Sequence, residues 1–161
     1  MTFVFYTEQS WVWSHPTSGA KLFQGNREAA AKPSSETTAK SLAVVADNMD
    51  IPAFEQGSKK RGYEKFRSAA LRDSGSMIPS ELEWTKAQAN AVADRLFEDL
   101  ARGRPVLVCC WSGYNRSGLV AALVMKKGGV DGQKAIDELR KNRSPHCLNN
   151  NLFERIVRGE A

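Results

Sequence analysis

Short apolar runs and helical repeats of apolar residues alternate along this chain. Runs rich in β-branched and aromatic residues predict strands, and apolar positions three and four residues apart predict helices. Strands are expected at residues 3–6, 10–14, 21–26, 41–46, 67–71 and 106–108. Because strands alternate with helices, we expect an α/β domain. The length suits one domain with a core of its own, which we assign to residues 1–161.

The clearest helix is expected to open over residues 79–83. Ser80 and Glu83 have the spacing of a capping box, and apolar positions recur at helical spacing over residues 82–100. Gly103 is expected to end this helix. Further helices are expected at residues 27–31, 34–39, 117–127 and 150–157. Another is expected to start at a cap at Asp131 and to end at a break at residues 143–145. Residues 47–62 are expected to form a polar loop.

The strand expected at residues 106–108 leads into a cysteine, a short loop and another helix. Cys110 follows this strand, the loop closes at Arg116 and Gly118, and residues 119–125 are again apolar. A loop that runs into a helix N-terminus directs backbone N–H groups and the positive end of the helix dipole to one point. Arg116 adds a planar fork of donors that matches phosphate oxygens. This arrangement predicts an anion site, beside which a cysteine is expected to be held as a nucleophilic thiolate.

The segment that begins at Cys110 reads Cys-Trp-Ser-Gly-Tyr-Asn-Arg-Ser-Gly. It resembles the Cys-x5-Arg-Ser signature of the protein tyrosine phosphatase superfamily. The dual-specificity branch usually reads His-Cys-x-x-Gly-x-x-Arg-Ser; here Gly113 and Ser117 match, and Cys109 stands in place of the histidine. That histidine helps to organise the loop in the family, so the resemblance makes Cys109 a loop-supporting position. On pattern alone, Cys109 is a small buried hydrophobic residue at the end of a strand.

Two further segments are similar to parts of dual-specificity phosphatases. They are the Leu-Phe-Gln-Gly strand at residues 22–25 and the Asn-x-x-Phe segment that begins at Asn150. The resemblance starts near residue 22 and covers residues 1–20 weakly. It implies a central, mostly parallel sheet of four to five strands flanked by helices on both faces. It also implies hydrolysis through a phosphocysteine, with no metal and no cofactor.

By the same resemblance, the loop after the cysteine binds the phosphate group of the substrate through its backbone N–H groups. The implied substrate-binding residues are Trp111, Ser112, Gly113, Tyr114, Asn115 and Arg116. None of the variable positions between Cys110 and Arg116 is basic. Lipid phosphatases of the superfamily usually carry lysines there, so the loop argues against a polyphosphoinositide substrate.

Cleavage of a phosphate ester also needs a proton for the leaving oxygen. In the resembling family this proton comes from an aspartate on a mobile loop upstream of the cysteine. Asp73 is our choice among the aspartates, because it follows an apolar strand and precedes a stretch rich in Gly and Ser. Capping of a turn is the alternative role for Asp73. Asp47 and Asp50 are the other candidates, Asp50 being the reserve, whereas Asp94 and Asp99 fall within the long helix as solvated or structural residues.

Two more residues receive roles through the resemblance. Ser117 is expected to hydrogen-bond the thiolate and to assist breakdown of the phosphocysteine. Asn150 is expected to brace the phosphate-binding loop. Each also has an ordinary structural role, Ser117 in the first turn of a helix and Asn150 as a helix N-cap.

Composition sets broad limits on partners and compartment. The net charge of +5 favours anionic substrates and is too small to indicate nucleic acid by itself. The three cysteines have no spacing typical of a disulfide framework, which indicates a reducing, cytoplasmic compartment. The chain starts without a basic leader followed by a long apolar core, so we expect no signal peptide and no membrane association.

The sequence therefore predicts a metal-independent phosphatase acting on phosphotyrosine, and on phosphoserine or phosphothreonine, in a protein or peptide substrate. One alternative is a pseudophosphatase that binds phosphorylated partners without turnover. Another is a different Cys-x5-Arg enzyme, acting for example on RNA 5′ ends. The Arg-Ser-Gly ending, Asp73 and the Asn-x-x-Phe segment favour the protein phosphatase. Nucleic acid is not the expected partner, and the sequence does not predict an oligomeric state.

Overall fold

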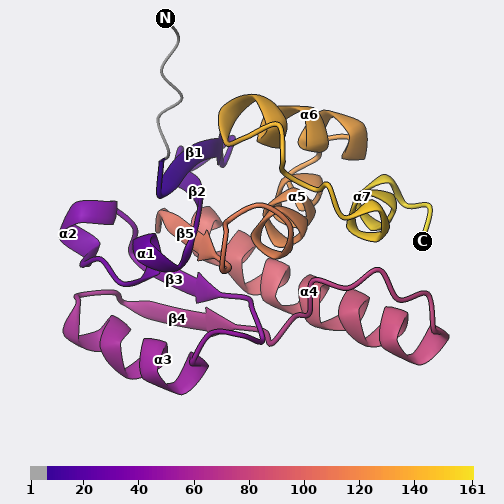
Figure 1. Ribbon diagram of the computed structural model, residues 1–161. Helices are drawn as coiled ribbons and strands as arrows, with labels where there is room; N and C mark the ends of the chain where they lie inside the picture. Colours follow the sequence, from indigo (N-terminus) through magenta and orange to yellow (C-terminus); the bar gives the residue numbers. More distant parts are fainter. Residues whose placement is uncertain (1–6) are drawn as a thin grey trace, which may run out of the picture.

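Five strands form one mixed sheet in the computed structural model, which describes residues 7–161 (Figure 1). The strands are β1 (Gln9–Ser14), β2 (Lys21–Gly25), β3 (Ser41–Val44), β4 (Lys65–Ser68) and β5 (Val106–Cys109). Their order across the sheet is β1-β2-β5-β3-β4. β1 is antiparallel to β2, and the other neighbouring pairs are parallel. The prediction of a mostly parallel sheet of four to five strands is confirmed.

Helices flank this sheet on both faces, as expected. They are α1 (Arg27–Ala30), α2 (Ser34–Thr37), α3 (Ile51–Lys60), α4 (Pro79–Ala101), α5 (Arg116–Lys127), α6 (Gly132–Asn142) and α7 (Asn151–Arg158). Every residue of β3 and β5 is buried, which requires cover on both sides of the centre of the sheet. Figure 1 shows α3 beside β3 and β4, and α4 packed against α5. Among residues 7–161, no helix is both long and apolar enough to cross a bilayer.

The strands next to the predicted cysteine end at the same level of the sheet. Cys109 at the end of β5 is in register with Gly25 at the end of β2 and with Val44 at the end of β3. Because these strands are parallel, the segments that follow them meet at one edge of the sheet, where ligands bind in open α/β folds. The residues after β2, β3 and β5 therefore form the neighbourhood of Cys110.

The helix after the cysteine loop is buried along nearly its whole length. Each residue of α5 from Arg116 to Met125 is buried, in agreement with the continuous apolar pattern. α5 packs against α4, α6 and α7 and against strands β2 and β5. The predicted helix at residues 117–127 is confirmed within one residue. The loop is thus fixed at both ends, by a central strand and by a central helix.

One helix was missed. Residues 47–62 were expected to form a loop, because they are polar and contain Pro52 and Gly57. They contain α3, in which Pro52 occupies a position in the first turn, where its missing N–H costs nothing. Asp50 caps this helix by accepting a hydrogen bond from the Ala53 N–H at 3.1 Å. The cap and the early proline indicate a helix start, which is hard to recognise because few positions of α3, among them Ile51 and Phe54, are apolar and pack against the core.

Two shorter predictions need correction. The strand expected at residues 67–71 is β4 at Lys65–Ser68, an edge strand whose residues are at most half-buried, so its apolar pattern is weak. The helix expected at residues 34–39 ends at Thr37, because Thr38 takes a left-handed backbone conformation with φ of 64°. The strand expected at residues 3–6 lies outside the described residues, whereas the strand at 10–14 is confirmed.

The capping box at Ser80 and Glu83 is wrong. α4 begins at Pro79, within the expected opening, but its N-cap is Ile78, which makes no side-chain cap, so Ser80 lies inside the helix. Proline suits this first helical position because its φ is already helical. The end of α4 agrees with the prediction, since Gly103 has φ of 84° just after the last helical turn.

Candidate active site

Cys110 and Ser117 face each other across the loop between β5 and α5. The Sγ of Cys110 lies 3.3 Å from the Ser117 Oγ, and both side chains are buried. Cys110 is the first residue after β5, and Ser117 lies in the first turn of α5. The predicted pairing of a thiol with this hydroxyl is therefore present in the geometry.

The backbone of this loop has free donors. Within the described part of the chain, none of the N–H groups of residues 111–116 donates a hydrogen bond. Gly113 has φ of 78°, and a Cβ there would come within 2.8 Å of the Gly25 carbonyl. The loop can take this shape only because position 113 is glycine. Unpaired N–H groups at the start of a helix are the kind of donors that bind an anion.

Arg116 closes the loop, and its own side chain is fixed by contacts with Asp47 and Leu71. Its Nη1 donates to Asp47 Oδ1 at 2.9 Å and to the Leu71 carbonyl at 3.3 Å. Its Nε is buried and has no hydrogen-bond partner among the described residues. A buried guanidinium with an unused donor beside free N–H groups is suited to one more anionic partner. The ion pair with Asp47 was not anticipated, because residues 47 and 116 meet only in the folded chain.

Gln24 braces the loop and was missed as a functional residue. This buried side chain on β2 donates from Nε2 to the Gly113 carbonyl at 3.0 Å and to Ser117 Oγ at 3.1 Å. Its Oε1 lies 3.8 Å from the Cys147 Sγ. The available signal was a polar residue in the middle of a predicted strand, since an amide that becomes buried there needs partners.

Two arginines support the loop from outside, and neither was predicted. Arg27 donates from Nη1 to the Trp111 carbonyl at 3.0 Å and lies 4.2 Å from the centre of the exposed Trp111 ring. Arg143 donates from Nε to the Gly113 carbonyl at 3.2 Å, and its guanidinium lies 5.5 Å from the Tyr114 ring. Both arginines bind carbonyl groups of the loop, whereas the N–H groups of residues 111–116 stay unpaired among the described residues.

The structure brings Asp73 to the same loop. Asn115 Nδ2 donates to Asp73 Oδ2 at 3.0 Å, and Asn150 Nδ2 donates to Asp73 Oδ1 at 2.8 Å. Asn150 also caps α7 by accepting from the Phe153 N–H at 3.2 Å, and its own N–H donates to Asn115 Oδ1 at 3.1 Å. Both expected roles of Asn150, contact with the loop and helix capping, thus have matching contacts.

The other candidate aspartates have structural partners. Asp50 is the cap of α3, and Asp94 forms an ion pair with Lys127. Asp99 is fully buried and accepts from Arg67 and from Arg104. Asp47 is paired with Arg116, so it belongs to the site without being free to act as a proton donor.

The two other cysteines are buried thiols. Burial raises the pKa of Cys109 well above its ordinary value, and the neighbouring Cys110 raises it further, against a smaller lowering by Arg143. Burial raises the pKa of Cys147 to about 11. All three cysteines are free. The predicted role of Cys109 in supporting the loop stays a prediction, since the contacts at this position come from its backbone, whose carbonyl accepts from the Val45 N–H at 2.9 Å.

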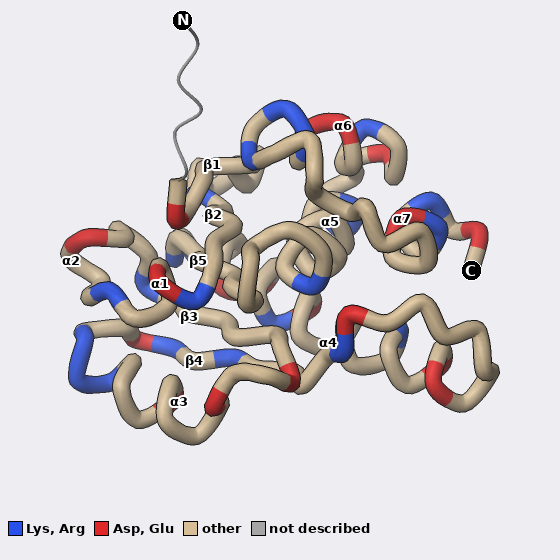
Figure 2. Tube along the Cα trace, viewed as in Figure 1, with Lys and Arg blue, Asp and Glu red and all other residues tan. Residues whose placement is uncertain are grey.

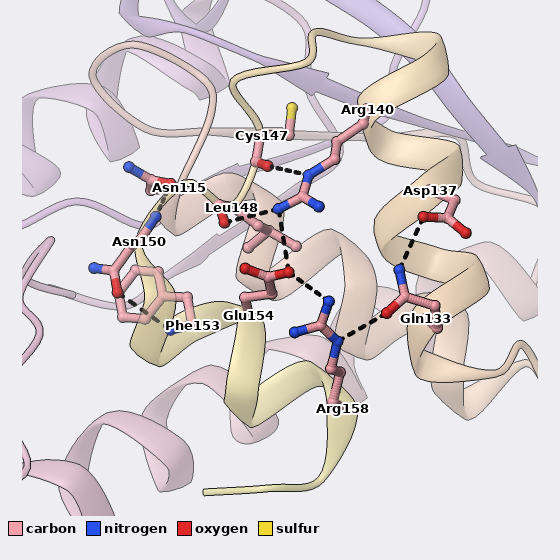
Figure 3. Close-up of polar contacts among 10 residues, drawn as sticks. All are labelled: Asn115, Gln133, Asp137, Arg140, Cys147, Leu148, Asn150, Phe153, Glu154 and Arg158. Atoms are coloured by element: carbon pink, nitrogen blue, oxygen red, sulfur yellow. Dashed lines mark hydrogen bonds and ion pairs between the residues drawn. The ribbon is translucent and has the colours of Figure 1, made fainter.

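The segment between α6 and α7 is fixed by an ion-pair network (Figure 3). Glu154 accepts from Arg158 at 2.6 Å and pairs with Arg140 at 3.5 Å. Arg140 also donates to the Cys147 carbonyl at 3.0 Å and to the Leu148 carbonyl at 3.2 Å. Figure 3 shows these side chains converging from α6 and α7 on the turn that precedes Asn150. The network therefore fixes the position from which Asn150 reaches the loop.

A family model described as the tyrosine phosphatase family matches residues 23–144. The chain belongs to this family. Among characterised members, the triple-specificity protein phosphatase PtpB of Mycobacterium tuberculosis is 38% identical over 103 residues, which are 63% of this chain. The match spans 36% of the length of PtpB.

Solved structures of PTP-like phosphatases share the fold. Human DUSP28 superposes with a TM-score of 0.71 at 17% identity, over 97% of this chain and 94% of that one. The active form of Tk-PTP gives a TM-score of 0.69 at 17% identity, over 97% of both chains. Kinase-associated phosphatase gives 0.68 at 16% identity, over 92% of this chain and 90% of that one. The shared fold therefore extends into the N-terminal region that the sequence resemblance covered weakly.

Proposed function

We propose that this tyrosine phosphatase family member is a metal-independent phosphatase that hydrolyses phosphotyrosine, and phosphoserine or phosphothreonine, in proteins or peptides. The observation that supports it is the loop of residues 110–116. Cys110 lies at its start beside Ser117, the N–H groups of residues 111–116 have no partner among the described residues, and a buried, unused donor of Arg116 closes the loop. We assign residues 1–161 to one catalytic domain.

The first half of the proposed reaction transfers the phosphoryl group to sulfur. The N–H groups of residues 111–116 and the Arg116 guanidinium bind the nonbridging oxygens, which neutralises their charge. The Cys110 thiolate attacks phosphorus, the S–P bond forms and the P–O bond to the leaving group breaks. The electron pair of that bond stays on the leaving oxygen, which takes a proton from the Asp73 carboxyl group.

The second half of the proposed reaction hydrolyses the phosphocysteine and regenerates the Cys110 thiolate. Asp73, now a carboxylate, accepts a proton from a water molecule as that water attacks phosphorus. The S–P bond breaks, its electrons return to sulfur, and inorganic phosphate leaves. Ser117, 3.3 Å from the Cys110 Sγ, stabilises the departing thiolate by a hydrogen bond.

The substrate class follows from the side chains around the loop. The variable positions Trp111, Ser112, Tyr114 and Asn115 carry no positive charge, so they offer nothing to a second phosphate group of a polyphosphorylated lipid. A phosphate monoester on a protein side chain needs only the single anion site. Lys, Arg, Asp and Glu are distributed over most elements of the chain (Figure 2), and this mixture together with a net charge of +5 does not favour RNA. We place the protein in the cytoplasm, because its three free cysteines suit a reducing compartment.

The proposal is tested by hydrolysis of p-nitrophenyl phosphate in the presence of a chelator. Wild type is compared with Cys110→Ser, Asp73→Asn and the surface control Asp137→Asn. We expect metal-independent turnover that Cys110→Ser abolishes, that Asp73→Asn lowers by about 10²-fold or more, and that Asp137→Asn leaves unchanged. Vanadate binding without turnover in the wild type would instead identify a pseudophosphatase. Turnover in Cys110→Ser would refute the phosphocysteine route.

A further inference from the structure

The segment that carries Asp73 is a strap of six residues, 72–77, with few backbone anchors. Among residues 7–161, no backbone–backbone hydrogen bond involves any of these six residues. Just before the strap, the Leu71 carbonyl accepts from the Asp47 N–H at 2.9 Å and from Arg116. After it, Ile78 occupies the N-cap position of α4, and its carbonyl accepts from the Leu82 N–H at 2.9 Å. Secondary structure thus fixes the strap at its ends and not along its length.

Cavities lie on both sides of the strap. Asp73, Gly75 and Met77 line a cavity of about 550 Å³, together with Asn115 and Asn150. Arg72, Ser74 and Ser76 line another of about 380 Å³, whose far wall includes Trp84 of α4. This alternation is that of an extended segment, with odd residues on one side and even residues on the other. Packing therefore holds the strap loosely, and the position of Asp73 depends on its polar contacts.

Two asparagines supply the contacts of Asp73. Asn115, in the phosphate-binding loop, donates to one carboxylate oxygen, and Asn150, at the start of α7, donates to the other. Asn150 Nδ2 also donates to the Ser74 carbonyl at 3.1 Å. Between Asp73 and Met77, the remaining polar contact with a distant segment joins Arg155 to the Met77 sulfur at 4.0 Å.

The two asparagines are themselves fixed in place. Asn115 Nδ2 also lies 2.7 Å from Asn149 Oδ1, and Asn115 Oδ1 accepts from the Asn150 N–H. Asn150 Oδ1 accepts from the Phe153 N–H in the cap of α7. Figure 3 shows Asn115 and Asn150 beside each other, on the side of the turn away from the Arg140–Glu154–Arg158 network. Because the Oδ1 of each asparagine accepts a hydrogen bond, each side chain is held in one orientation, in which its Nδ2 donates to Asp73.

We propose that Asn115 and Asn150 are positioning residues that hold the carboxyl group of Asp73 over the phosphate-binding loop. The inference rests on the proposed function, in which Asp73 is the proton donor. Asn115 is the residue immediately before Arg116, so the contact ties the donor directly to the group that binds phosphate. A shift of about 1 Å in a catalytic group costs up to about 10²-fold in rate, and a strap with cavities on both sides cannot prevent such a shift by packing.

This role has a signature that a purely structural role lacks. Protonation of the leaving oxygen matters greatly for a basic leaving group such as phenol. It matters little for an acidic one such as a difluorinated umbelliferone. Loss of a residue that positions the acid must therefore slow the first kind of substrate selectively. General disruption of the loop would slow both kinds.

The test compares kcat/KM for phenyl phosphate and for difluorinated methylumbelliferyl phosphate in Asn115→Ala, Asn150→Ser and Asp73→Asn. Serine at position 150 keeps an oxygen that can cap α7 and removes the amide donor. Asn90→Ala, which removes a remote amide on α4, is the matched control. We expect kcat/KM for phenyl phosphate to fall about tenfold or more in both asparagine variants. For the fluorinated substrate we expect a change within about threefold, and no change for Asn90→Ala with either substrate.

Each result has one meaning. Equal losses with both substrates, or no loss with either, in the asparagine variants would overturn the positioning role. If Asp73→Asn shows the selective loss and the asparagine variants do not, only this inference fails. If Asp73→Asn itself shows no selectivity, the acid assignment in the proposed function fails first. Thermal unfolding identifies a variant that does not fold, and the other asparagine then carries the test, because each removes one of the two donors.

Discussion

The amide of Gln24 joins three parts of the site that are far apart in the sequence. It binds the Gly113 carbonyl, the Ser117 hydroxyl and the Cys147 thiol from a buried position on β2. A buried polar group that loses its partner costs about 1–3 kcal/mol. Gln24 therefore contributes both to folding and to the orientation of the Ser117 hydroxyl toward Cys110.

Replacement of Gln24 by leucine tests this contribution. Gln24→Leu keeps the volume and removes the amide, so the Gly113 carbonyl and Ser117 lose a buried donor. We expect the free energy of unfolding to fall by about 1–3 kcal/mol and kcat to fall by about tenfold. Urea unfolding and steady-state kinetics measure the two effects. A variant with unchanged kcat would show that Ser117 is oriented without Gln24.

The three thiols are expected to differ in reactivity. Burial raises the pKa of Cys109 and that of Cys147, so both stay protonated and unreactive near neutral pH. Brief treatment of the folded protein with iodoacetamide at neutral pH should then modify Cys110, and Cys110→Ser should take up no label. Peptide mapping identifies the labelled residue. Labelling of Cys147 in the folded state would contradict the assigned burial effect.

At the scale of single elements, the phosphate-binding loop depends on one left-handed glycine. Gly113 has φ of 78°, and a Cβ there would lie 2.7 Å from Arg143 Nη2 and 2.8 Å from the Gly25 carbonyl. Gly103 has a similar φ of 84° at the end of α4, with open space around the position of a Cβ. Both glycines therefore have a left-handed backbone, but only at Gly113 would an added Cβ collide with neighbouring atoms.

This pair separates backbone strain from steric conflict. Gly103→Ala is expected to cost about 1 kcal/mol of stability, as for an alanine in left-handed backbone, and to keep full activity. Gly113→Ala is expected to cost more and to lower phosphatase activity by about 10²-fold, because the loop backbone must move. Thermal unfolding and hydrolysis of an aryl phosphate measure both variants. Equal behaviour of the two would exclude a specific role for the clash.

The buried charge of Asp99 connects edge strand β4 to the end of α4. Its carboxylate is fully buried and accepts from Arg67 on β4 and from Arg104 before β5. Asp99→Leu leaves both guanidinium groups without this partner, at a cost of about 3–5 kcal/mol. Urea unfolding measures the loss. A loss of less than about 1 kcal/mol in the free energy of unfolding would show that both guanidinium groups become hydrated instead.

For the whole molecule, buried thiols predict how stability varies with pH. The pKa of Cys147 is raised to about 11 from an ordinary value of 9.0, and that of Cys109 is also raised. A thiol with a raised pKa binds its proton more tightly in the folded state, so its contribution is complete below pH 9 and is lost as pH rises toward 11. The Cys147 shift corresponds to about 2–3 kcal/mol. The midpoint of urea unfolding should fall between pH 9 and pH 11 in the wild type, and should fall less steeply in Cys147→Ala. An equally steep fall in the two proteins would contradict a contribution of the Cys147 thiol.

The architecture was largely predictable, because its signals are local. The buried strands β3 and β5 and the helix α5 are apolar runs, and the Cys-x5-Arg spacing placed Cys110, Arg116 and Ser117 in one loop. Helix α3 was missed, since most of its residues are polar and only a short face with Ile51 and Phe54 packs against the core. Its start could have been inferred from Asp50 and Pro52.

The supporting residues of the site could not be predicted in this way. Asp47, Arg27 and Arg143 lie in three segments that meet the loop only after folding, and their residue types are ordinary on a protein surface. The strand order brings the ends of β2, β3 and β5 to one edge of the sheet, and that order is a property of the whole chain. Asp73 was chosen through a family resemblance, and its asparagine contacts emerged from the fold.

Capture of the phosphoryl group on Cys110 is the decisive test of the proposed phosphocysteine mechanism. The enzyme is mixed with an aryl phosphate, quenched rapidly in acid, digested and analysed by mass spectrometry. The proposed mechanism predicts one phosphoryl group on the peptide that contains Cys110 during turnover, and none in Cys110→Ser. Turnover with no adduct at Cys110, or with an adduct at another residue, would contradict it.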